Sequence, residues 1–181
     1  MLLMELIASD KEEKILVLRK LEIRDTEFML EWMHDEFVNR NFRFDFASMT
    51  RDKVLDFIAN SFNDETQSFA FVDENDEYMG TISLKHISRN DGNAEYAVVT
   101  RTCAQGTGLA KKATEELLVY AFQKLKLHRV YLNVLEENER ANAFYRKCGF
   151  QYEGQSKEHL YIQGEYKNLN WYGILAKDFN A

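Results

Sequence analysis

Two glycines between a short apolar segment and a helical pattern are the first feature of this sequence that points to chemistry. Residues 94–100 lead through a short connection into residues 105–110, which read QGTGLA, and helical spacing of apolar residues begins there. Glycines leave the backbone uncovered and free to turn. Successive N–H groups at the start of a helix then converge on an anion. The sequence therefore predicts a phosphate-binding loop, and Lys111 and Lys112 add positive charge near it.

Two common phosphate-binding fingerprints do not fit this loop. A Rossmann dinucleotide fingerprint needs a third glycine at the position that Lys111 occupies. A Walker loop needs Gly-Lys-Ser/Thr, which the loop lacks. Because an isolated Gly-x-Gly is also compatible with an ordinary strand-to-helix turn, the ligand has to be identified from a second motif.

That second motif follows residues 130–135, which read as a strand. It spans residues 138–150 with the sequence NERANAFYRKCGF. Its pattern is Asn138-x-x-Ala141-x-x-x-Tyr145-x-x-x-Gly149-Phe150, and the loop supplies Gln105-x-x-Gly108-x-Ala110. Together they resemble the GNAT superfamily of acyl-CoA N-acyltransferases. Within it, the chain is similar to the branch of ribosomal-protein N-terminal, spermidine and amino-sugar acetyltransferases, and the resemblance covers about residues 15–177.

The resemblance implies how acetyl-CoA, the expected co-substrate, would be held. A strand edge would bind the pantetheine arm through backbone hydrogen bonds, much as a sheet takes up an added strand. The residues of that edge are Val98, Val99 and Thr100, and those whose N–H groups would grip the pyrophosphate are Gln105, Gly106, Thr107, Gly108, Leu109 and Ala110. Asn138 would hydrogen-bond the cofactor arm, and Tyr145 would lie near its sulfur.

The chemistry itself sets requirements for the site. Attack on a thioester requires a neutral amine, whereas a free alkylamine has a pKa of about 10. The site must therefore remove a proton, directly or through water, and must protonate the departing thiolate. Tyr145 is the candidate general acid, because a phenol can donate a proton at short range. The N–H of Val98 or Val99 is placed to polarise the thioester carbonyl.

Glu95 is the candidate general base. It begins the strand beside the expected cofactor site, and some GNAT relatives place there a glutamate that acts through water. Two other interpretations stay open. Strand alternation can turn Glu95 outward, and Tyr145 can be an aromatic residue on the inner face of a short helix.

The acceptor amine is expected beside the first two helices and the final hairpin, as in GNAT relatives. Acidic and aromatic groups there suit a cationic amine. The predicted acceptor contacts are Trp32, Asp35, Arg43 and Asp45, with Tyr161, Tyr166 and Trp171 from the hairpin. Polyamine relatives carry adjacent acids where this chain reads Phe44-Asp45-Phe46. An amino sugar would use Arg43, whereas a protein N-terminus would need a broader groove, so these acceptor classes stay open.

Hydrophobic periodicity gives the elements that must position these residues. Strands are predicted at 15–23, 68–73, 78–87, 94–99, 130–135 and on both sides of Gln163-Gly164, and helices from Asp25 or Thr26 to Asn39, after Thr50, from about 110 to 125 and at 139–148. Strands joined by short turns pair antiparallel, whereas the strand-helix-strand unit 94–135 pairs parallel. The fold class is therefore α/β (α+β). We expect one GNAT-like domain over residues 1–181, with a mixed, mostly antiparallel sheet flanked by helices, whose central parallel strands splay apart to admit acetyl-CoA.

Composition narrows the function classes. The 181 residues are 45% hydrophobic, which suits one ordinary domain and excludes global disorder. A net charge of −7 argues against nucleic acid as partner. Residues 1–93 carry 11 Lys+Arg against 20 Asp+Glu. This acidic half either meets a cation or merely keeps the protein soluble.

Other features exclude further classes. No stretch approaches the roughly 20 apolar residues of a membrane span, and the start MLLMELIA lacks the basic leader of a secretory signal. Cys103 and Cys148 form no disulfide framework, and none of the His and Cys residues has metal-ligand spacing. We therefore predict a cytoplasmic acetyltransferase without a metal, and a homodimer by resemblance. The alternatives are a catalytically silent CoA-binding sensor and an interaction domain.

Overall fold

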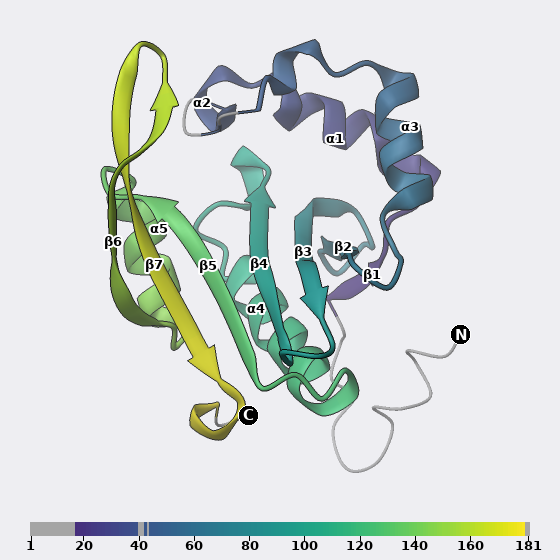
Figure 1. Cartoon of the computed structure of the whole chain (residues 1–181). Helices are drawn as coiled ribbons and strands as arrows, with labels where there is room; N and C mark the ends of the chain where they lie inside the picture. The colour runs from purple at the N-terminus through teal and green to yellow at the C-terminus, as the bar shows by residue number, and fades with distance from the viewer. Residues whose placement is uncertain (1–16, 40–41, 43, 180–181) are drawn as a thin grey trace.

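Seven strands of the described chain lie in one mixed sheet (Figure 1). The computed structural model describes residues 17–39, 42 and 44–179. The sheet has the order β1-β2-β3-β4-β5-β7-β6. Its strands are β1 (Leu18–Lys20), β2 (Gln67–Val72), β3 (Tyr78–Ser88), β4 (Asn93–Thr100), β5 (Arg129–Leu135), β6 (Gln151–Ile162) and β7 (Glu165–Leu175). Neighbouring strands are antiparallel except β4 and β5, which pair parallel as the sequence predicts.

The helices of the described chain follow the predicted order, except that the first predicted helix is divided into two, α1 (Thr26–Met33) and α2 (Glu36–Asn39). The others are α3 (Arg51–Asn60), α4 (Leu109–Val119) and α5 (Glu139–Lys147). A π-helical turn, Tyr120–Lys124, continues α4. The buried side chains of Ala113, Leu117 and Ala121 therefore run along one face of this long element, as their spacing predicts.

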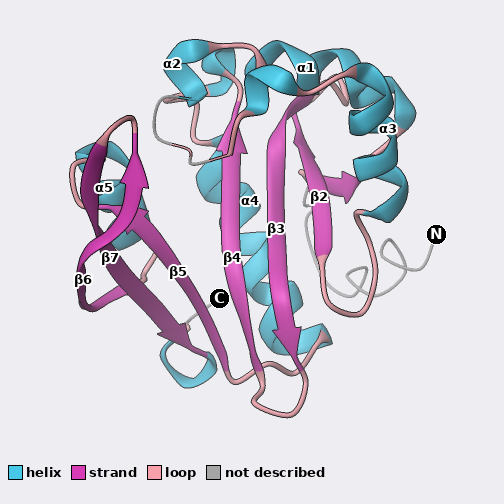
Figure 2. Ribbon diagram, turned by 45° about the horizontal axis from the view of Figure 1, so that its top comes forward, coloured by secondary structure: helices cyan, strands magenta, loops and turns pink. Residues whose placement is uncertain are grey.

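Helices cover both faces of the sheet, and strand alternation explains how. In β2, Phe69 and Phe71 pack into the cluster that contains α4 and α5. Their neighbours Ala70 and Val72 pack into a second cluster with α1 and α3. Successive side chains of a strand point to opposite faces, so this fully buried strand serves two cores. Figure 2 shows α4 behind β3 and β4, with α1 and α3 at the other side of the sheet.

The segment between β1 and α1 differs from the prediction. The strand expected to reach residue 23 ends at Lys20, and residues 23–25 form a 3-10 turn; residues 15 and 16 lie outside the described residues. Asp25 precedes α1 but does not cap it with its side chain. Its carboxylate instead accepts hydrogen bonds from the Arg19 guanidinium at 2.7 and 2.8 Å. The Thr26 hydroxyl donates to the carbonyl of Ile23 at 2.7 Å.

The helix predicted to reach Asn39 is interrupted. It ends at Met33, and α2 begins at Glu36. The Asp35 Oδ1 atom accepts the Phe37 N–H at 2.9 Å, which supplies a start for α2. Short polar side chains compete with the backbone for its own hydrogen bonds, so one aspartate divides an otherwise helical pattern. The next predicted cap is confirmed, since the Thr50 hydroxyl accepts the Lys53 N–H at 3.4 Å.

Gly80 allows β3 to lie against β4. A β-carbon on Gly80 would be 2.3 Å from the carbonyl oxygen of Val99 and 2.4 Å from the Phe71 ring. We expect Gly80→Ala to lower the free energy of unfolding by about 1–3 kcal/mol, the usual cost of overpacking. Urea unfolding followed by circular dichroism measures this change. An unchanged unfolding midpoint would contradict the close approach of the two strands.

Candidate active site

The parallel strands β4 and β5 stay together for only three residue pairs. The last pair joins Glu95 to Tyr131. Beyond it, β4 continues to Thr100 paired only with β3, and β5 continues to Leu135 paired only with β7. The predicted splay is therefore confirmed. Backbone N–H and C=O groups require partners, so the two facing strand edges are suited to an extended ligand with amide groups.

The loop that leads from β4 into α4 has the conformation required of an anion cradle. Gly106 and Gly108 have φ angles of +80° and +88°, in the left-handed region that β-carbons disfavour. No heavy atom lies within 4 Å of the position that a β-carbon would take on either glycine. Among the described residues, the N–H groups of Gly106, Gly108 and Ala110 have no acceptor. They stand at the positive end of α4, so the loop fits a diphosphate.

Arg140, which the sequence analysis did not single out, places a positive charge beside this loop. Arg140, in the first turn of α5, donates from Nη1 to Oε1 of Gln105. It therefore joins the second motif to the first. Lys111, one of the two predicted lysines, forms an ion pair with Glu115 at 3.1 Å. Arg140 belongs to the segment NERANAFY, but its charge alone does not indicate which surface it faces.

Tyr145 lies on the inner side of α5, near the point where β4 leaves β5. Its ring packs edge-on against Tyr96, with centroids 5.9 Å apart, and against Phe150 at 6.1 Å. Tyr96 directly follows Glu95, the last residue of β4 to pair with β5. Burial raises the pKa of the Tyr145 phenol well above its usual range, so the phenol stays protonated. Its hydroxyl has no hydrogen-bond partner among the described residues, which leaves its proton available to a ligand.

Asn138 has a structural role, in addition to the hydrogen bond to the cofactor arm that the sequence analysis predicts. It is the N-cap of α5, and its Oδ1 atom accepts the Ala141 N–H at 3.1 Å. The Nδ2 group has no acceptor among the described residues. The amide can therefore cap the helix and donate to a cofactor arm at the same time.

Glu95 points to the sheet face opposite α4 and α5. Its neighbours Ala94 and Tyr96 are buried in the cluster that contains those helices, so alternation turns Glu95 the other way. Its side chain is 25% exposed, and its Oε2 atom lies 3.7 Å from His86 Nε2. Asn133 donates to Oε1 at 3.2 Å. The carboxylate therefore lies where β4 and β5 begin to separate, and solvent can reach it.

The predicted acceptor contacts do not all come together. Trp32 is a core residue, 4% exposed, whose indole donates to the hydroxyl of buried Tyr78 at 3.0 Å. The expectation that it contacts an acceptor is therefore dropped. Asp35 accepts a hydrogen bond from the Thr102 hydroxyl at 2.9 Å, beside the glycine loop. Asp45 is exposed, and Arg43 lies outside the described residues.

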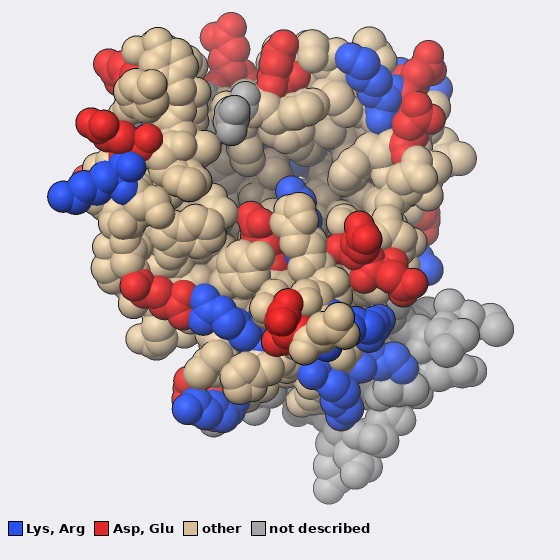
Figure 3. Space-filling model, viewed as in Figure 1, with Lys and Arg blue, Asp and Glu red and all other residues tan. Residues whose placement is uncertain are grey.

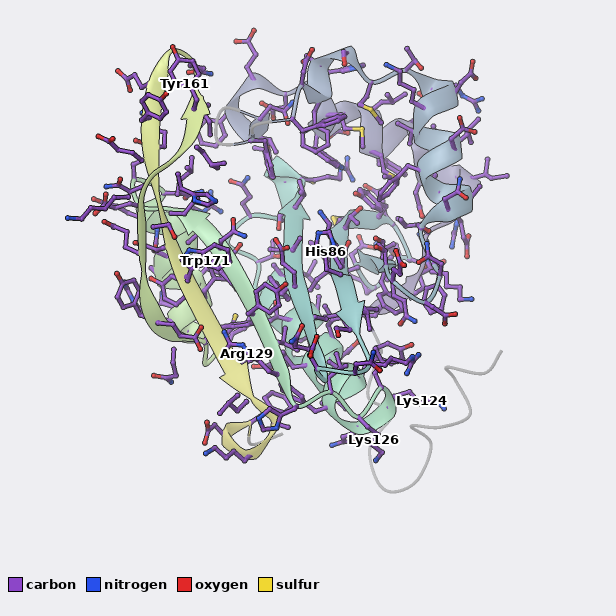
Figure 4. The ribbon with its side chains drawn as sticks, viewed as in Figure 1. His86, Lys124, Lys126, Arg129, Tyr161 and Trp171 are labelled. Carbon is purple, nitrogen blue, oxygen red and sulfur yellow. The ribbon has the colours of Figure 1, made fainter. Side chains whose placement is uncertain are left out.

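The face between α2 and the β6–β7 hairpin suits an acceptor site. Figure 3 shows this face of the molecule hollowed between the helices and the β6–β7 hairpin. Figures 1 and 2 both place α2 beyond the end of β4, on the side that faces the β6–β7 hairpin. Tyr161, labelled near the hairpin tip in Figure 4, is 59% exposed and packs against Tyr166 with centroids 5.0 Å apart. Trp171 lies lower on β7 and donates to Ser156.

Arg101 ties the loop between β4 and α4 to α1. It directly follows β4 and is 7% exposed. Its guanidinium donates to Glu31 of α1 at 2.8 and 3.1 Å and to Glu77 at 2.8 Å. The same group lies over the Phe28 ring at 4.5 Å. The start of the loop and α1 therefore form one connected unit.

Two further observations concern Cys148 and the lengths of the helices. Burial raises the pKa of the Cys148 thiol to about 11, so it stays protonated and is a poor nucleophile. No helix among the described residues combines the length and the apolar character that crossing a membrane requires.

Several known proteins are similar to this chain in sequence. A family model for the acetyltransferase (GNAT) domain matches residues 16–151. The spermidine N(1)-acetyltransferase of Escherichia coli K12 is 32% identical over 116 residues, which are 64% of this chain and 62% of that protein. The spermidine N(1)-acetyltransferase of Vibrio cholerae is 29% identical over 91% of this chain and 95% of that protein.

A solved structure agrees with these sequence matches. It is the spermidine N-acetyltransferase of Vibrio cholerae in complex with CoA and spermine. Its TM-score is 0.81 at 26% identity, and the match covers 89% of this chain and 95% of that chain. The splayed strands, the glycine loop and the tyrosine on α5 therefore stand in a fold shared with these relatives, and the chain belongs to the GNAT family of acetyltransferases.

Proposed function

We propose that this chain is an acetyl-CoA-dependent N-acetyltransferase that acts on a primary amine of a small molecule by direct attack in a ternary complex. One observation carries the proposal. The strand whose edge is left unpaired by the splay also leads into the loop with free N–H groups, and a buried, protonated phenol packs beside the same strand. One extended thioester cofactor can use all three features.

Each group has one task in this reaction. The Glu95 carboxylate accepts a proton from the ammonium form of the acceptor through a water molecule. The neutral amine attacks the acetyl carbonyl, and the backbone N–H of Val98 or Val99 stabilises the charge that develops on its oxygen. The C–N bond forms, the nitrogen releases its surplus proton to water, the C–S bond breaks, and the Tyr145 hydroxyl donates its proton to the departing sulfur. The phenol regains a proton from solvent.

We further propose a cationic amine, in first place a polyamine, as the acceptor. The named substrate of the relatives is spermidine. The N-terminal half is acidic, and exposed Asp45 lies in its helical region. A single exposed carboxylate is a weak clamp for a polyamine, so an amino sugar is the second candidate. Both acceptors attack through a primary amine, and the cofactor site is the same for each.

A thiol-release assay with acetyl-CoA tests this function across polyamines, amino sugars, aminoglycosides, amino acids and N-terminal peptides. We expect turnover that is fastest with spermidine or spermine. Calorimetry with acetyl-CoA accompanies the assay. Binding without turnover on any amine would indicate a CoA sensor instead, and the absence of binding would contradict the cofactor site itself.

Glu95→Gln tests the proposed base. We expect kcat/KM to fall by about 10²-fold at neutral pH, in the range typical of losing a general base. The loss should shrink as the pH approaches the pKa of the amine, because more of the amine is then already neutral. Glu27→Gln, at an exposed α1 carboxylate paired with Arg51, is the control. Equal pH profiles for wild type and Glu95→Gln would exclude Glu95 as the base.

A further inference from the structure

Asn142 is a buried polar side chain at the centre of the α5 packing. It is 4% exposed, and it lies on α5 one turn before Tyr145. Its Nδ2 group donates to the carbonyl of Leu135 at 2.9 Å, of Asn138 at 2.8 Å and, more weakly, of Glu136 at 3.3 Å. One amide therefore holds the end of β5 and the start of α5 together.

The other side of the same amide reaches β7. Its Oδ1 atom accepts from Asn170 Nδ2 at 2.9 Å and from the Tyr172 hydroxyl at 2.9 Å. The Tyr172 ring in turn packs against the Tyr145 ring, with centroids 6.4 Å apart. Asn170 also accepts a hydrogen bond from Gln155 of β6 at 3.0 Å. The network thus extends from the hairpin strands to the helix that carries Tyr145.

Packing alone does not require an amide at this position. An apolar side chain suffices to fill the inner face of a helix, and a buried polar group is costly unless its hydrogen-bonding capacity is satisfied. Asn142 satisfies both its donor and its acceptor atoms, on three separate elements. Because hydrogen bonds are directional, this set of bonds defines the position and the rotation of α5, which apolar packing alone does not. The group most sensitive to that rotation is Tyr145, whose hydroxyl has no tether of its own among the described residues.

We propose that Asn142 is a positioning residue for acetyl transfer, which holds the Tyr145 phenol where it can protonate the departing sulfur. This inference rests on the proposed function. It concerns the rate of transfer more than the affinity for the cofactor, because Asn142 bonds to β5, α5 and β7 and to no residue of the glycine loop. Misplacement of a catalytic group by about 1 Å can lower a rate by about 10²-fold.

A double-mutant cycle tests the proposal with spermidine and acetyl-CoA. Asn142→Leu should lower kcat by about 10²-fold, with a smaller change in the KM for acetyl-CoA. In the Tyr145→Phe background, the same substitution should have almost no further effect, because two residues that act through one group are not additive. Equal fold losses in both backgrounds would overturn the proposal, as would an unchanged kcat.

A second variant covers the case in which Asn142→Leu does not fold. Tyr172→Phe removes one of the two donors to Asn142 and keeps the ring, so we expect a smaller loss of kcat that also disappears in the Tyr145→Phe background. A loss that persists there would overturn the proposal. Asn63→Ala is the matched control. Its side chain also bonds to backbone, accepting the N–H groups of Glu65 and Thr66 at 2.9 Å, but it lies in the loop after α3, so its loss should lower stability without lowering kcat.

A crystal structure of Asn142→Leu, or of Tyr172→Phe if the first does not fold, separates this proposal from the proposed function. We expect the Tyr145 hydroxyl to move relative to the β4 backbone in the variant. A wild-type protein without turnover would contradict the function alone, and the shifted phenol would still support the positioning role. An unmoved phenol would overturn the positioning role, whatever the activity of the wild type.

Discussion

Tyr145→Phe is expected to lower kcat for acetyl transfer by about 10²- to 10⁴-fold, the range found for positioned general acids. The phenol is protonated, because burial raises its pKa well above the usual range. Removing the hydroxyl removes the proton for the departing thiolate but keeps the ring that packs against Tyr96 and Phe150. Affinity for acetyl-CoA, measured by calorimetry, should therefore stay close to that of the wild type.

The pH dependence gives a separate check on the same residue. The acid works in its protonated form, and a raised pKa extends that form to higher pH. The wild-type rate should therefore show no decline attributable to Tyr145 between pH 7 and pH 9. Tyr152→Phe, at a tyrosine that is 51% exposed, is the control and should keep full activity. A Tyr145→Phe enzyme with wild-type kcat would remove the phenol from the mechanism.

Gly108→Val is expected to weaken acetyl-CoA binding strongly. Gly108 has φ +88°, and a β-branched residue in left-handed backbone costs about 1–3 kcal/mol. If the loop escapes this strain by changing conformation, the N–H groups of Gly106, Gly108 and Ala110 no longer converge. A loss of that size corresponds to a roughly 5- to 150-fold higher dissociation constant, which calorimetry measures directly.

Gly164→Val is a closely matched control for this substitution. Gly164 has φ +86°, and like Gly108 it has no heavy atom within 4 Å of a β-carbon position. The backbone strain is therefore similar, but Gly164 lies in the β6–β7 turn, away from α4. We expect Gly164→Val to lower stability and to leave acetyl-CoA affinity unchanged. Equal affinities for both variants and the wild type would show that the glycine loop does not hold the diphosphate.

Local patterns account for most of the fold. Hydrophobic spacing predicts α4 because Ala113, Leu117 and Ala121 share one face, and that face is buried. The parallel pairing of β4 with β5 follows from the helix that joins them. The break before Asp35 was not predicted, since periodicity records which face is apolar and not whether a side chain competes for a backbone N–H.

The site was only partly predictable for a different reason. The glycines of the loop act through local backbone geometry, and local sequence predicts that geometry. Trp32, Arg140 and Asn142 act through partners that are distant in the chain: Tyr78, Gln105 and Tyr172 respectively. An exposed aromatic at helical spacing and a buried one look alike in sequence. Hence the sequence predicted the backbone conformation of the glycine loop, whereas its predicted acceptor contacts included a core residue, Trp32.

The early end of the β4–β5 ladder has a consequence for regulation. Under the proposed function, a binding surface made of strand edges and loop amides would recognise the long arm and diphosphate of the cofactor, which the acetylated and the free thiol forms share. Free CoA should therefore compete with acetyl-CoA for the same binding site. Turnover in a cell would then follow the ratio of the two forms more closely than the amount of either.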